Sequence, residues 1–563
     1  MIILVPQTKN MKNYVYLFLS FVALLTLIFC SKEDPQPQTN NPETIEEVDI
    51  TTIATDPWWN NTVFYEIFVR SFYDSNGDGI GDLQGIIEKL DYLNDGNPNT
   101  TSDLGITGIW LMPIFPSPSY HGYDVTDYRD INEDYGTMAD FRALIQAAHA
   151  RGIKVIIDFV GNHTSDQHPW FQSSAANTAK RNWYVWNTAK PSYNGPWGQE
   201  VWHERNNNYY YGIFWGGMPD LNYNNTEVTQ EIKDIVQFWY NDVGVDGFRI
   251  DAVKHWIEAG SQQENTPATL NWWRNFFAFQ KGINPRLMTV GEAWTSTTNI
   301  APYSDHRLDY CFEFDLSYAI IDAVNNQNAS GLRSKMTEIV NTYAAGQFGS
   351  FLTNHDQDRS FNRFGLNQQK AKLAASILLT LPGVPYLYYG EEIGMIGQKP
   401  DENIRKPMQW SAGAQAGFTS GQAWQSPNNN FASYNVADQQ EEENSLLNHY
   451  KKWIGLRNSI PQLRTGEIIM ASNSASSIFS YIRKSTDASA SYLVVHNLAQ
   501  GRDDFPITVS TSGLAEGQYV LRNVLTDNSI GQLNVNANGS IDGTAEAVAL
   551  DGFTSYVLRL ELQ

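Results

Sequence analysis

The sequence predicts an α/β protein: a (β/α)8 TIM barrel with a small domain inserted after the third strand, followed by a C-terminal antiparallel β-sandwich. Three observations carry this prediction. Eight short apolar runs alternate with helical patterns between residues 56 and 465, and one gap between them is much too long for a simple crossover. From residue 466 to 563 the pattern changes to closely spaced alternating runs with turns. At 563 residues the chain is long enough for two or three domains.

The eight apolar runs have the near-continuous apolar character of parallel strands that are buried on both faces. In chain order they are Val63–Val69, Ile106–Met112, Lys154–Phe159, Val245–Ile250, Leu287–Val290, Tyr310–Phe314, Ser350–Thr353 and Pro385–Tyr389. Stretches between them, such as Leu83–Leu93, Met138–Ala150 and Val228–Asn241, carry apolar residues at helical spacing. Strand and helix therefore alternate as a barrel requires.

Two further regions complete the domain plan. Residues 162–222, between the third and fourth strands, are rich in Trp, Tyr and Asn and predict a small inserted domain over the barrel mouth. The terminal sandwich is predicted from the runs Ser477–Arg483, Tyr492–Leu498, Phe505–Val509, Tyr519–Asn523 and Ser555–Leu562. It shows no obvious sugar-binding residues, so we assign it a packing role.

The N-terminal segment predicts a cellular address and a tether. A basic start at Lys12 precedes the apolar run Tyr14–Phe29 and then Cys30, and the run is short for a membrane-spanning helix. It resembles a bacterial lipoprotein signal, in which the cysteine becomes the lipidated first residue. Residues 1–29 are then the signal peptide and residues 30–55 a flexible tether. We expect an outer-membrane lipoprotein at the cell surface, held in the membrane only by a lipid anchor on Cys30; a periplasmic or secreted protein is the alternative.

Composition limits the partners. Lys and Arg number 38 against 61 Asp and Glu, a net charge of −23, which argues against nucleic acid and anionic membrane surfaces as ligands. Two cysteines exclude a disulfide scaffold. The 17 Trp and 29 Tyr suit a neutral ligand with flat apolar faces.

Polar residues follow the predicted strands at their carboxyl ends, where barrel enzymes place their active sites. Asp251 follows the fourth strand, Glu292 the fifth and Asp356 the seventh. Three converging carboxylates cannot share one protonation state. A glycosidase needs that split, because one carboxylate is an ionised nucleophile and another a protonated acid. Arg249 lies on the same side of its strand as Asp251 and would hold it ionised.

The segments that carry these residues resemble the four signature regions of the α-amylase family, glycoside hydrolase family 13. They are Ile156–His163 (IIDFVGNH), Gly244–His255 (GVDGFRIDAVKH), Val290–Thr295 (VGEAWT) and Phe351–Arg359 (FLTNHDQDR). The resemblance extends from about Trp58 to Trp410. It implies that Asp251 is the nucleophile, Glu292 the general acid/base and Asp356 a third carboxylate that binds sugar hydroxyls. The implied sugar-binding residues are Tyr123, His163, Arg249, Lys254, His255 and His355.

The loop of residues 74–82 (DSNGDGIGD) is a candidate calcium site. Oxygen side chains alternate with glycines, as in loops that wrap a hard cation. An EF-hand is excluded, since position twelve is Gly85 and not Glu. A metal-free turn is the alternative. The loop also resembles the family's calcium loop, which implies a structural Ca²⁺ bound by Asp74, Asn76, Asp78, Asp82 and the Ile80 carbonyl. A further family calcium site would use Asn162, but the sequence shows no acidic partner for it.

Residues near the pocket predict the bond that is cleaved. Tyr120 stands where relatives that trim single glucoses carry a closing Asp, which favours internal cleavage. Lys254 and His255 resemble α-1,4-acting amylases, whereas Ile404–Trp410 (IRKPMQW) is similar to the oligo-1,6-glucosidases. We expect a retaining, endo-acting hydrolase of α-1,4 bonds in starch-like glucans and maltooligosaccharides, with other glucan-uptake proteins as further partners. The alternatives are an α-glucosidase or oligo-1,6-glucosidase, a cyclomaltodextrinase or neopullulanase-like hydrolase, and a non-catalytic starch-binding protein.

Overall fold

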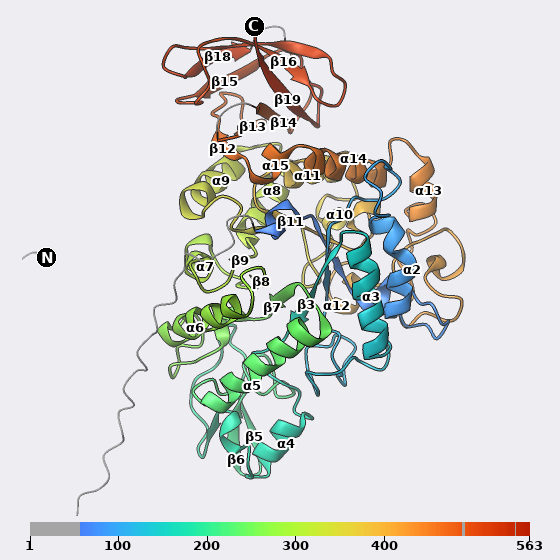
Figure 1. Cartoon of the computed structure of the whole chain (residues 1–563), viewed down its shortest axis with the longest axis vertical. Helices are drawn as coiled ribbons and strands as arrows, with labels where there is room; N and C mark the ends of the chain where they lie inside the picture. Colours follow the sequence, from blue (N-terminus) through green and yellow to red (C-terminus); the bar gives the residue numbers. More distant parts are fainter. Residues whose placement is uncertain (1–56, 487–489, 546–547) are drawn as a thin grey trace, which may run out of the picture. The chain divides into compact units, whose positions relative to one another are not determined.

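Eight parallel strands form the centre of the computed structural model, which describes residues 57–486, 490–545 and 548–563 (Figure 1). The predicted signal peptide 1–29 and tether 30–55 lie outside these residues. The strands are β1 (Phe64–Ile67), β2 (Gly108–Leu111), β3 (Lys154–Phe159), β7 (Gly247–Ile250), β8 (Met288–Gly291), β9 (Tyr310–Cys311), β10 (Gly349–Phe351) and β11 (Val384–Tyr388). They pair in the order β10-β11-β1-β2-β3-β7-β8-β9, and a parallel bridge between Phe312 and Gly349 brings the last strand to the first. The predicted barrel is confirmed.

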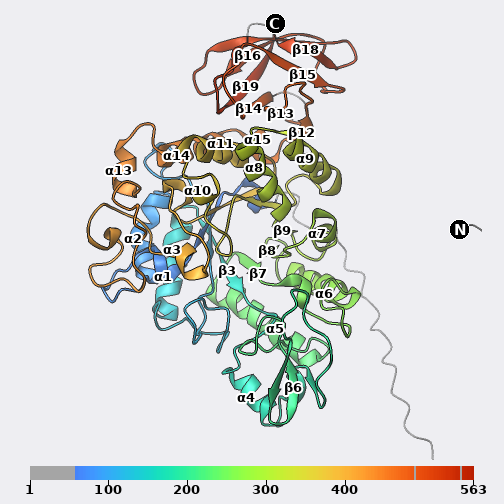
Figure 2. The ribbon, with the colours of Figure 1, turned by 180° about the vertical axis from the view of Figure 1, so that it is seen from behind.

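Helices surround these strands, as the views from the front and from behind show (Figures 1 and 2). The longer ones are α2 (Leu83–Leu93), α3 (Met138–Ala150), α5 (Thr226–Gln237), α6 (Pro267–Ile283), α8 (Phe314–Asn326), α9 (Ser330–Thr342), α11 (Gln368–Thr380) and α14 (Leu446–Ser459). The shorter ones include α7 (Thr297–Ser304) and α12 (Asp401–Ile404). Many begin at a side-chain cap; for example, Thr137 and Asp140 form a reciprocal capping box at α3. None of the helices in the described residues is both long and apolar enough to cross a bilayer.

Two predicted strands run too far along the chain. The prediction Tyr310–Phe314 ends as β9 at Cys311, and helix α8 already begins at Phe314. Likewise the first prediction includes Val69, where a short helix starts. In both places an apolar strand passes directly into a buried helix, so no change in hydrophobicity marks the boundary.

Register aligns the carboxyl ends of neighbouring strands. Asp158 at the end of β3 pairs with Arg249 of β7, and Ile250 pairs with Gly291 of β8. The approach is close: a Cβ on Gly247 would lie 2.4 Å from the Met288 carbonyl oxygen. The residues that follow β3, β7 and β8 therefore leave the barrel side by side.

The insertion leaves and returns at paired positions. His163 bridges Asp220, and Tyr184 bridges Leu221, in antiparallel fashion. Between them lie α4 (Pro169–Ala175) and a small sheet of β4 (Trp186–Asn187), β6 (Asn208–Tyr211) and β5 (Trp202–Arg205), in that order. A separate cluster of Val201, Trp202, Tyr211 and Ile213 forms its core. The inserted segment is thus fixed to the barrel at its base.

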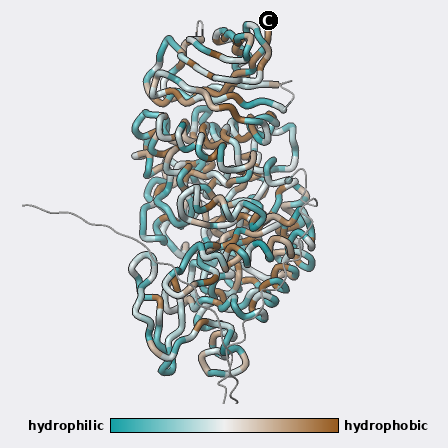
Figure 3. Tube along the Cα trace, turned by 90° about the vertical axis from the view of Figure 1, so that its left-hand side faces the viewer, coloured by the Kyte–Doolittle hydropathy of each residue, from teal (hydrophilic) through white to brown (hydrophobic). Residues whose placement is uncertain are grey.

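The C-terminal region consists of two antiparallel sheets that share a core. One has the order β12 (Glu467–Met470), β13 (Ile478–Lys484), β14 (Ser491–Asn497), β19 (Thr554–Leu562), β16 (Gly517–Asn523) and β17 (Ser529–Val535); the other pairs β15 (Phe505–Val509) with β18 (Ile541–Ala545). Figure 3 shows hydrophobic and hydrophilic residues interspersed along the C-terminal region. Strands β12, β17 and β18 were not predicted. β12 has only four residues (EIIM) and no apolar–polar alternation, while β17 and β18 are polar and partly exposed.

Strand β13 joins this region to the barrel. Ile478 and Ile482 face the sandwich core, whereas Phe479 and Tyr481 join the large cluster that includes the barrel helices. The Tyr481 hydroxyl donates to Thr380 Oγ1 at 2.8 Å, at the end of α11. Both faces of β13 are therefore buried.

Candidate active site

The three predicted catalytic carboxylates line one pocket of about 670 Å³ at the carboxyl ends of the barrel strands. Asp251 follows β7 and Glu292 follows β8, while Asp356 lies in the loop after β10. All six predicted sugar-binding residues lie at this site. Tyr123, His163, Lys254 and His255 line the pocket, while Arg249 and His355 contact its carboxylates directly. The structure thus brings together residues that are up to 233 positions apart, from Tyr123 to Asp356.

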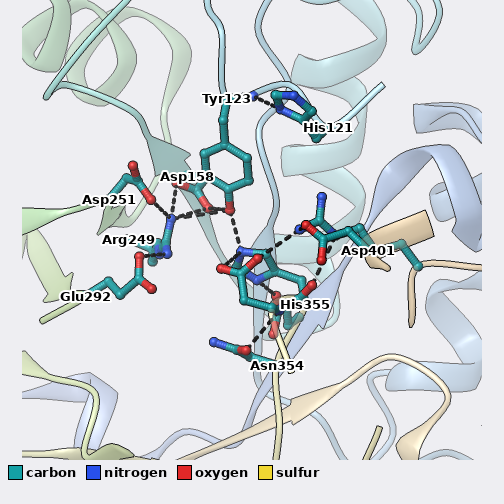
Figure 4. A network of polar contacts seen from close by, with 12 residues as sticks. His121, Tyr123, Asp158, Arg249, Asp251, Glu292, Asn354, His355 and Asp401 are labelled. Atoms are coloured by element: carbon teal, nitrogen blue, oxygen red, sulfur yellow. Dashed lines mark hydrogen bonds and ion pairs between the residues drawn. The ribbon is translucent and has the colours of Figure 1, made fainter. Parts of the chain in front are cut away.

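The guanidinium of Arg249 holds the centre of this pocket together (Figure 4). Its Nη1 donates to both carboxylate oxygens of Asp158, at 2.8 and 2.9 Å, and to Asp251 Oδ1 at 2.9 Å. Its Nη2 donates to Glu292 Oε2. Arg249 and Asp158 are completely buried. One cation therefore fixes the predicted nucleophile and the predicted acid relative to each other.

The two carboxyls differ in acidity. Burial raises the pKa of Asp251 to about 6, although Arg249 opposes the shift. Burial likewise raises the pKa of Glu292 to about 7, again against Arg249, and the negative charges of Asp251 and Asp356 raise it further. Near neutral pH Asp251 is thus the more ionised of the two, and Glu292 is the one that retains a proton.

Asp356 is held ionised by different cations. Burial alone would raise its pKa, but the positive charge and hydrogen bond of His355, together with Arg405, hold the pKa of Asp356 far below its usual range. His355 Nε2 lies 3.2 Å from Asp356 Oδ2, and Arg405 Nη2 lies 2.8 Å from Oδ1. On its other side, His355 Nδ1 lies 2.5 Å from Glu66 Oε1. Although burial lowers it, the pKa of His355 is raised to about 10 by Asp356 and Glu66.

The aromatic residue and the histidines that were predicted to bind sugar are positioned by contacts with other protein groups. Tyr123 stacks on His355 with ring centroids 5.6 Å apart, and its hydroxyl donates to Asp158 Oδ2 at 3.1 Å. His163 Nε2 donates to the Tyr123 carbonyl at 3.0 Å, and burial lowers the pKa of His163 to about 3. Burial also lowers the pKa of His255 to about 4. Both rings are therefore neutral.

Lys254, three residues after Asp251, also lines the pocket. Its Nζ donates to Glu264 Oε2 at 2.7 Å and to the Trp294 carbonyl at 3.2 Å. This contact joins the segment after β7 to the segment after β8. Ala252, next to the nucleophile, has φ = +51°, a left-handed backbone that non-glycine residues adopt at a cost.

Sequence reasoning missed several residues of this site. Glu66, within β1, is buried and pairs with His355. In the sequence, a single carboxylate within an apolar strand was the feature that could have indicated it. Asp401 and Arg405 also line the pocket, and Arg405 Nη2 donates to Asp401 Oδ2 at 3.2 Å. Arg405 belongs to the IRKPMQW segment, whose likeness to the oligo-1,6-glucosidases was noted without placing it at the pocket.

Exposed tryptophans surround the pocket mouth. Five large hydrophobic side chains are exposed in the described part of the chain, and three of them are Trp197 (58%), Trp215 (54%) and Trp294 (39%), all of which line this pocket. Trp197 stacks on Phe214 with centroids 5.8 Å apart, and Trp294 stacks on Phe314 at 4.7 Å. Their exposed ring faces suit the apolar faces of sugars.

The predicted calcium loop precedes α2 and is separate from this pocket. Asp74 accepts from the backbone N–H groups of Asn76, Gly77 and Gly79, and Asp82 caps α2 by accepting from Gly85 at 2.6 Å. Gly77 and Gly79 have φ of +85° and +95°, which turns the backbone around these oxygens. Elsewhere, Asn162 donates to Asp220 at 3.2 Å, which supplies the acidic neighbour that the sequence did not reveal. Within the described ranges, no three His, Cys, Asp or Glu side chains gather as a metal site.

Comparison with known proteins agrees with this geometry. Residues 66–466 match the family model of the alpha-amylase catalytic domain, which is well over half of the chain. The chain belongs to the alpha-amylase family. It is accordingly an enzyme, a glycoside hydrolase of alpha-amylase type, and the alternative of a non-catalytic starch-binding protein is set aside.

Individual relatives differ in their activities. Alpha-amylase 3 of Dictyoglomus thermophilum is 44% identical over 460 residues, which covers 80% of this chain and 87% of the relative. An oligo-1,6-glucosidase of Parageobacillus thermoglucosidasius is 33% identical and covers 71% and 83%. The crystal structure of an alpha-amylase from H. orenii superposes with a TM-score of 0.76 at 42% identity and covers 89% of this chain and 99% of that one.

The acidity of the two carboxyls predicts a bell-shaped pH dependence of kcat/KM, with its optimum between about 6 and 7. Below the pKa of Asp251, about 6, the predicted nucleophile is protonated; above the pKa of Glu292, about 7, the predicted acid has lost its proton. Because the two groups interact, the limbs report apparent values of the pair. Glu292→Gln should remove the alkaline limb on a glycosyl fluoride, whose leaving group needs no proton. An alkaline limb that persists in this variant would refute the assignment.

Proposed function

We propose that this enzyme is a retaining, endo-acting hydrolase of α-1,4-glucosidic bonds in starch-like glucans and maltooligosaccharides. The observation that carries the proposal is the pair Asp251 and Glu292, held on one guanidinium with the higher pKa on Glu292. That arrangement supplies a nucleophile and an acid at one bond.

In this mechanism Asp251 attacks the anomeric carbon while Glu292 gives its proton to the leaving oxygen, and the glycosidic C–O bond breaks. The sugar is then an ester of Asp251. Glu292, now ionised, takes a proton from a water molecule that attacks the same carbon, which frees Asp251 and retains the anomeric configuration. Asp356 remains ionised throughout and is placed to accept hydrogen bonds from sugar hydroxyls.

Endo-action is favoured by the width of the binding surface. The exposed tryptophans come from both the inserted domain and the segment after β8, so stacking surfaces extend on more than one side of the carboxylates. Lys254, which joins the segments after β7 and β8, would present a cation to hydroxyls beyond the bond that is cut. A substrate with several consecutive glucosyl units would use all of these contacts.

A second candidate, an α-glucosidase or oligo-1,6-glucosidase, is favoured by one specific contact. Arg405 pairs with both Asp356 and Asp401 at the pocket wall. The Arg405–Asp401 pair would form a charged barrier near Tyr120, the position where relatives that trim single glucoses carry an Asp. Such a barrier would restrict the enzyme to chain ends. Some relatives are named oligo-1,6-glucosidase and 4-alpha-glucanotransferase, so α-1,6 cleavage and glucan transfer are further alternatives for this enzyme.

Product analysis separates these candidates. On amylose we expect a mixture of maltooligosaccharides at the earliest times, with less activity on dextran, because an open cleft binds internal segments.

Asp251→Asn should lower kcat by about 10³-fold or more, since no other group replaces the nucleophile. Arg405→Ala should leave the amylose product pattern endo-type. Glucose alone from the first time points would identify the end-acting enzyme, products longer than the substrate a transferase, and exclusive cleavage of dextran would overturn the α-1,4 assignment.

We propose further that residues 74–82 bind a structural Ca²⁺. The support is the all-oxygen donor set of Asp74, Asn76, Asp78 and Asp82 with the Ile80 carbonyl, in a loop whose glycines turn the backbone inward. Because Asp82 also caps α2, the ion would stabilise the start of that helix. It would take no part in bond cleavage.

Chelation should therefore lower thermal stability and leave the chemistry intact. EDTA is expected to lower Tm, and Ca²⁺ in hundredfold excess over Kd to restore about 2.7 kcal/mol of stability. Asp78→Asn should weaken this response, whereas Asp322→Asn, an exposed carboxylate on α8, should not. If neither Tm nor bound calcium, measured by atomic emission, responds to EDTA, the loop is a metal-free turn.

The cellular location is proposed from the sequence alone. We propose that Cys30 carries a lipid that anchors the enzyme in the outer membrane, with access to extracellular glucan and to other glucan-uptake proteins. In the producing cell, Cys30→Ser should move the activity from the membrane fraction to the soluble fraction and abolish labelling by a fatty-acid probe. If the parent protein is already found in the soluble fraction, and Cys30→Ser does not change this, the periplasmic or secreted alternative is supported.

A further inference from the structure

A second cavity, of about 460 Å³, lies against the small sheet of the inserted domain. Residues of β4, β5 and β6 line it, together with Glu258 and Gly260 from the segment between β7 and α6. None of its lining residues belongs to the catalytic pocket. Its volume lies within the range of small-ligand sites.

The lining has a distinct chemistry. It contains no Lys, Arg or His, so nothing in it would compensate an anionic ligand. Its polar groups are mostly side-chain amides, each with donors and an acceptor: Asn182, Asn187, Asn222 and Asn224. The rings of Trp186, Trp202 and Tyr211 supply the apolar part. Amides that form paired hydrogen bonds beside aromatic rings suit a ligand with adjacent hydroxyls and apolar C–H faces.

Two lining groups, Trp202 Nε1 and Glu258 Oε1, have no hydrogen-bond partner within the described residues. Glu258 Oε1 is buried and makes no hydrogen bond within the described residues. Burial raises the pKa of Glu258 to about 8, so near neutral pH the carboxyl retains a proton and can both donate and accept. A buried polar atom without a partner is costly, and a hydroxyl group of a ligand would satisfy it.

We propose that this cavity is a second carbohydrate-binding site, which holds a short segment of the same α-glucan that the enzyme cleaves. The inference rests on the proposed function for the identity of the sugar. It assigns the inserted domain a role in retaining polymer, in addition to forming one wall of the catalytic pocket.

The two sites are connected through the protein. The Tyr211 hydroxyl, at the second cavity, donates to Gln263 Oε1 at 3.0 Å. The Gln263 carbonyl accepts from Nδ1 of His255 at 2.9 Å, and His255 lines the catalytic pocket. Along the chain, Tyr193 lines the second cavity and Trp197 the first. A glucan segment held at the second site therefore remains close to the catalytic carboxylates.

The test compares polymer with short substrate in a double variant, Asn187→Ala with Asn224→Ala. Both side chains are exposed, so the fold should be unaffected. We expect KM for soluble starch to rise about two- to tenfold, as for one or two lost hydrogen bonds, with kcat unchanged. Activity on 4-nitrophenyl maltotrioside should equal that of the parent. Thr188→Ala, exposed and next to Asn187 but outside the cavity, is the matched control.

Calorimetry with maltoheptaose separates the second site from catalysis. In the Glu292→Gln background we expect two binding events, one of which is lost in the double variant and weakened by Glu258→Leu, which removes both the donor and the acceptor. A single event that the double variant leaves unchanged would overturn the second site even if the parent hydrolyses starch. If Ca²⁺ raises Tm through Glu258 while no second glucan binds, the cavity is a cation site and the proposal is wrong. Hydrolysis of the maltotrioside by the parent reports the proposed function independently.

Discussion

The active site depends on one buried cation, Arg249, and on the carboxylates that surround it. A completely buried guanidinium is tolerable only when it is paired, because the cost of leaving water is several kcal/mol for a single ion. Asp158 on the neighbouring strand β3 supplies part of that pairing, and the pocket residues Asp251 and Glu292 supply the rest. The register of β3, β7 and β8 is therefore a requirement of electrostatics as well as of packing, and the strained backbone at Ala252 is held in place beside it by the hydrogen bond from Val253 to the Glu292 carbonyl.

The distribution of cations decides which carboxyl does which chemistry. Asp356 contacts two cations, His355 and Arg405, and stays ionised, whereas Asp251 and Glu292 share a single guanidinium that Asp158 also uses. Sharing leaves too little positive charge to ionise both at neutral pH, and the field of the other carboxylates adds to the cost. Glu66 completes the arrangement, since without it the buried His355 would lack the second carboxylate that keeps it protonated.

Residues that could be predicted from the sequence are those whose place follows from a strand end. Asp251, Glu292 and Asp356 were located in this way, because parallel strands present their carboxyl ends at one face. Glu66, Asp401 and Arg405 were not, since each reaches the site from a position with no such geometric rule: inside β1, or at the short helix α12 far along the chain. The edge strands β17 and β18 were not predicted because they are polar and half-exposed, and β12 was not predicted because its four residues show no apolar–polar alternation.

In the proposed function, the inserted domain would allow a fixed chemical centre to act on a polymer. Arg249 and its carboxylates need to contact only one glycosidic bond, and nothing in that centre distinguishes a long chain from a short one. Residues 162–222, fixed at their base by the His163–Asp220 and Tyr184–Leu221 bridges, add surfaces at a distance from the bond. One of these is the wall of Trp197, Phe214 and Trp215, and the other is the cavity beside Glu258. Because the cavity is joined through Gln263 to His255, which contacts Trp197 of this wall, contacts with distant parts of a chain would, in the proposed function, position the bond that Asp251 attacks.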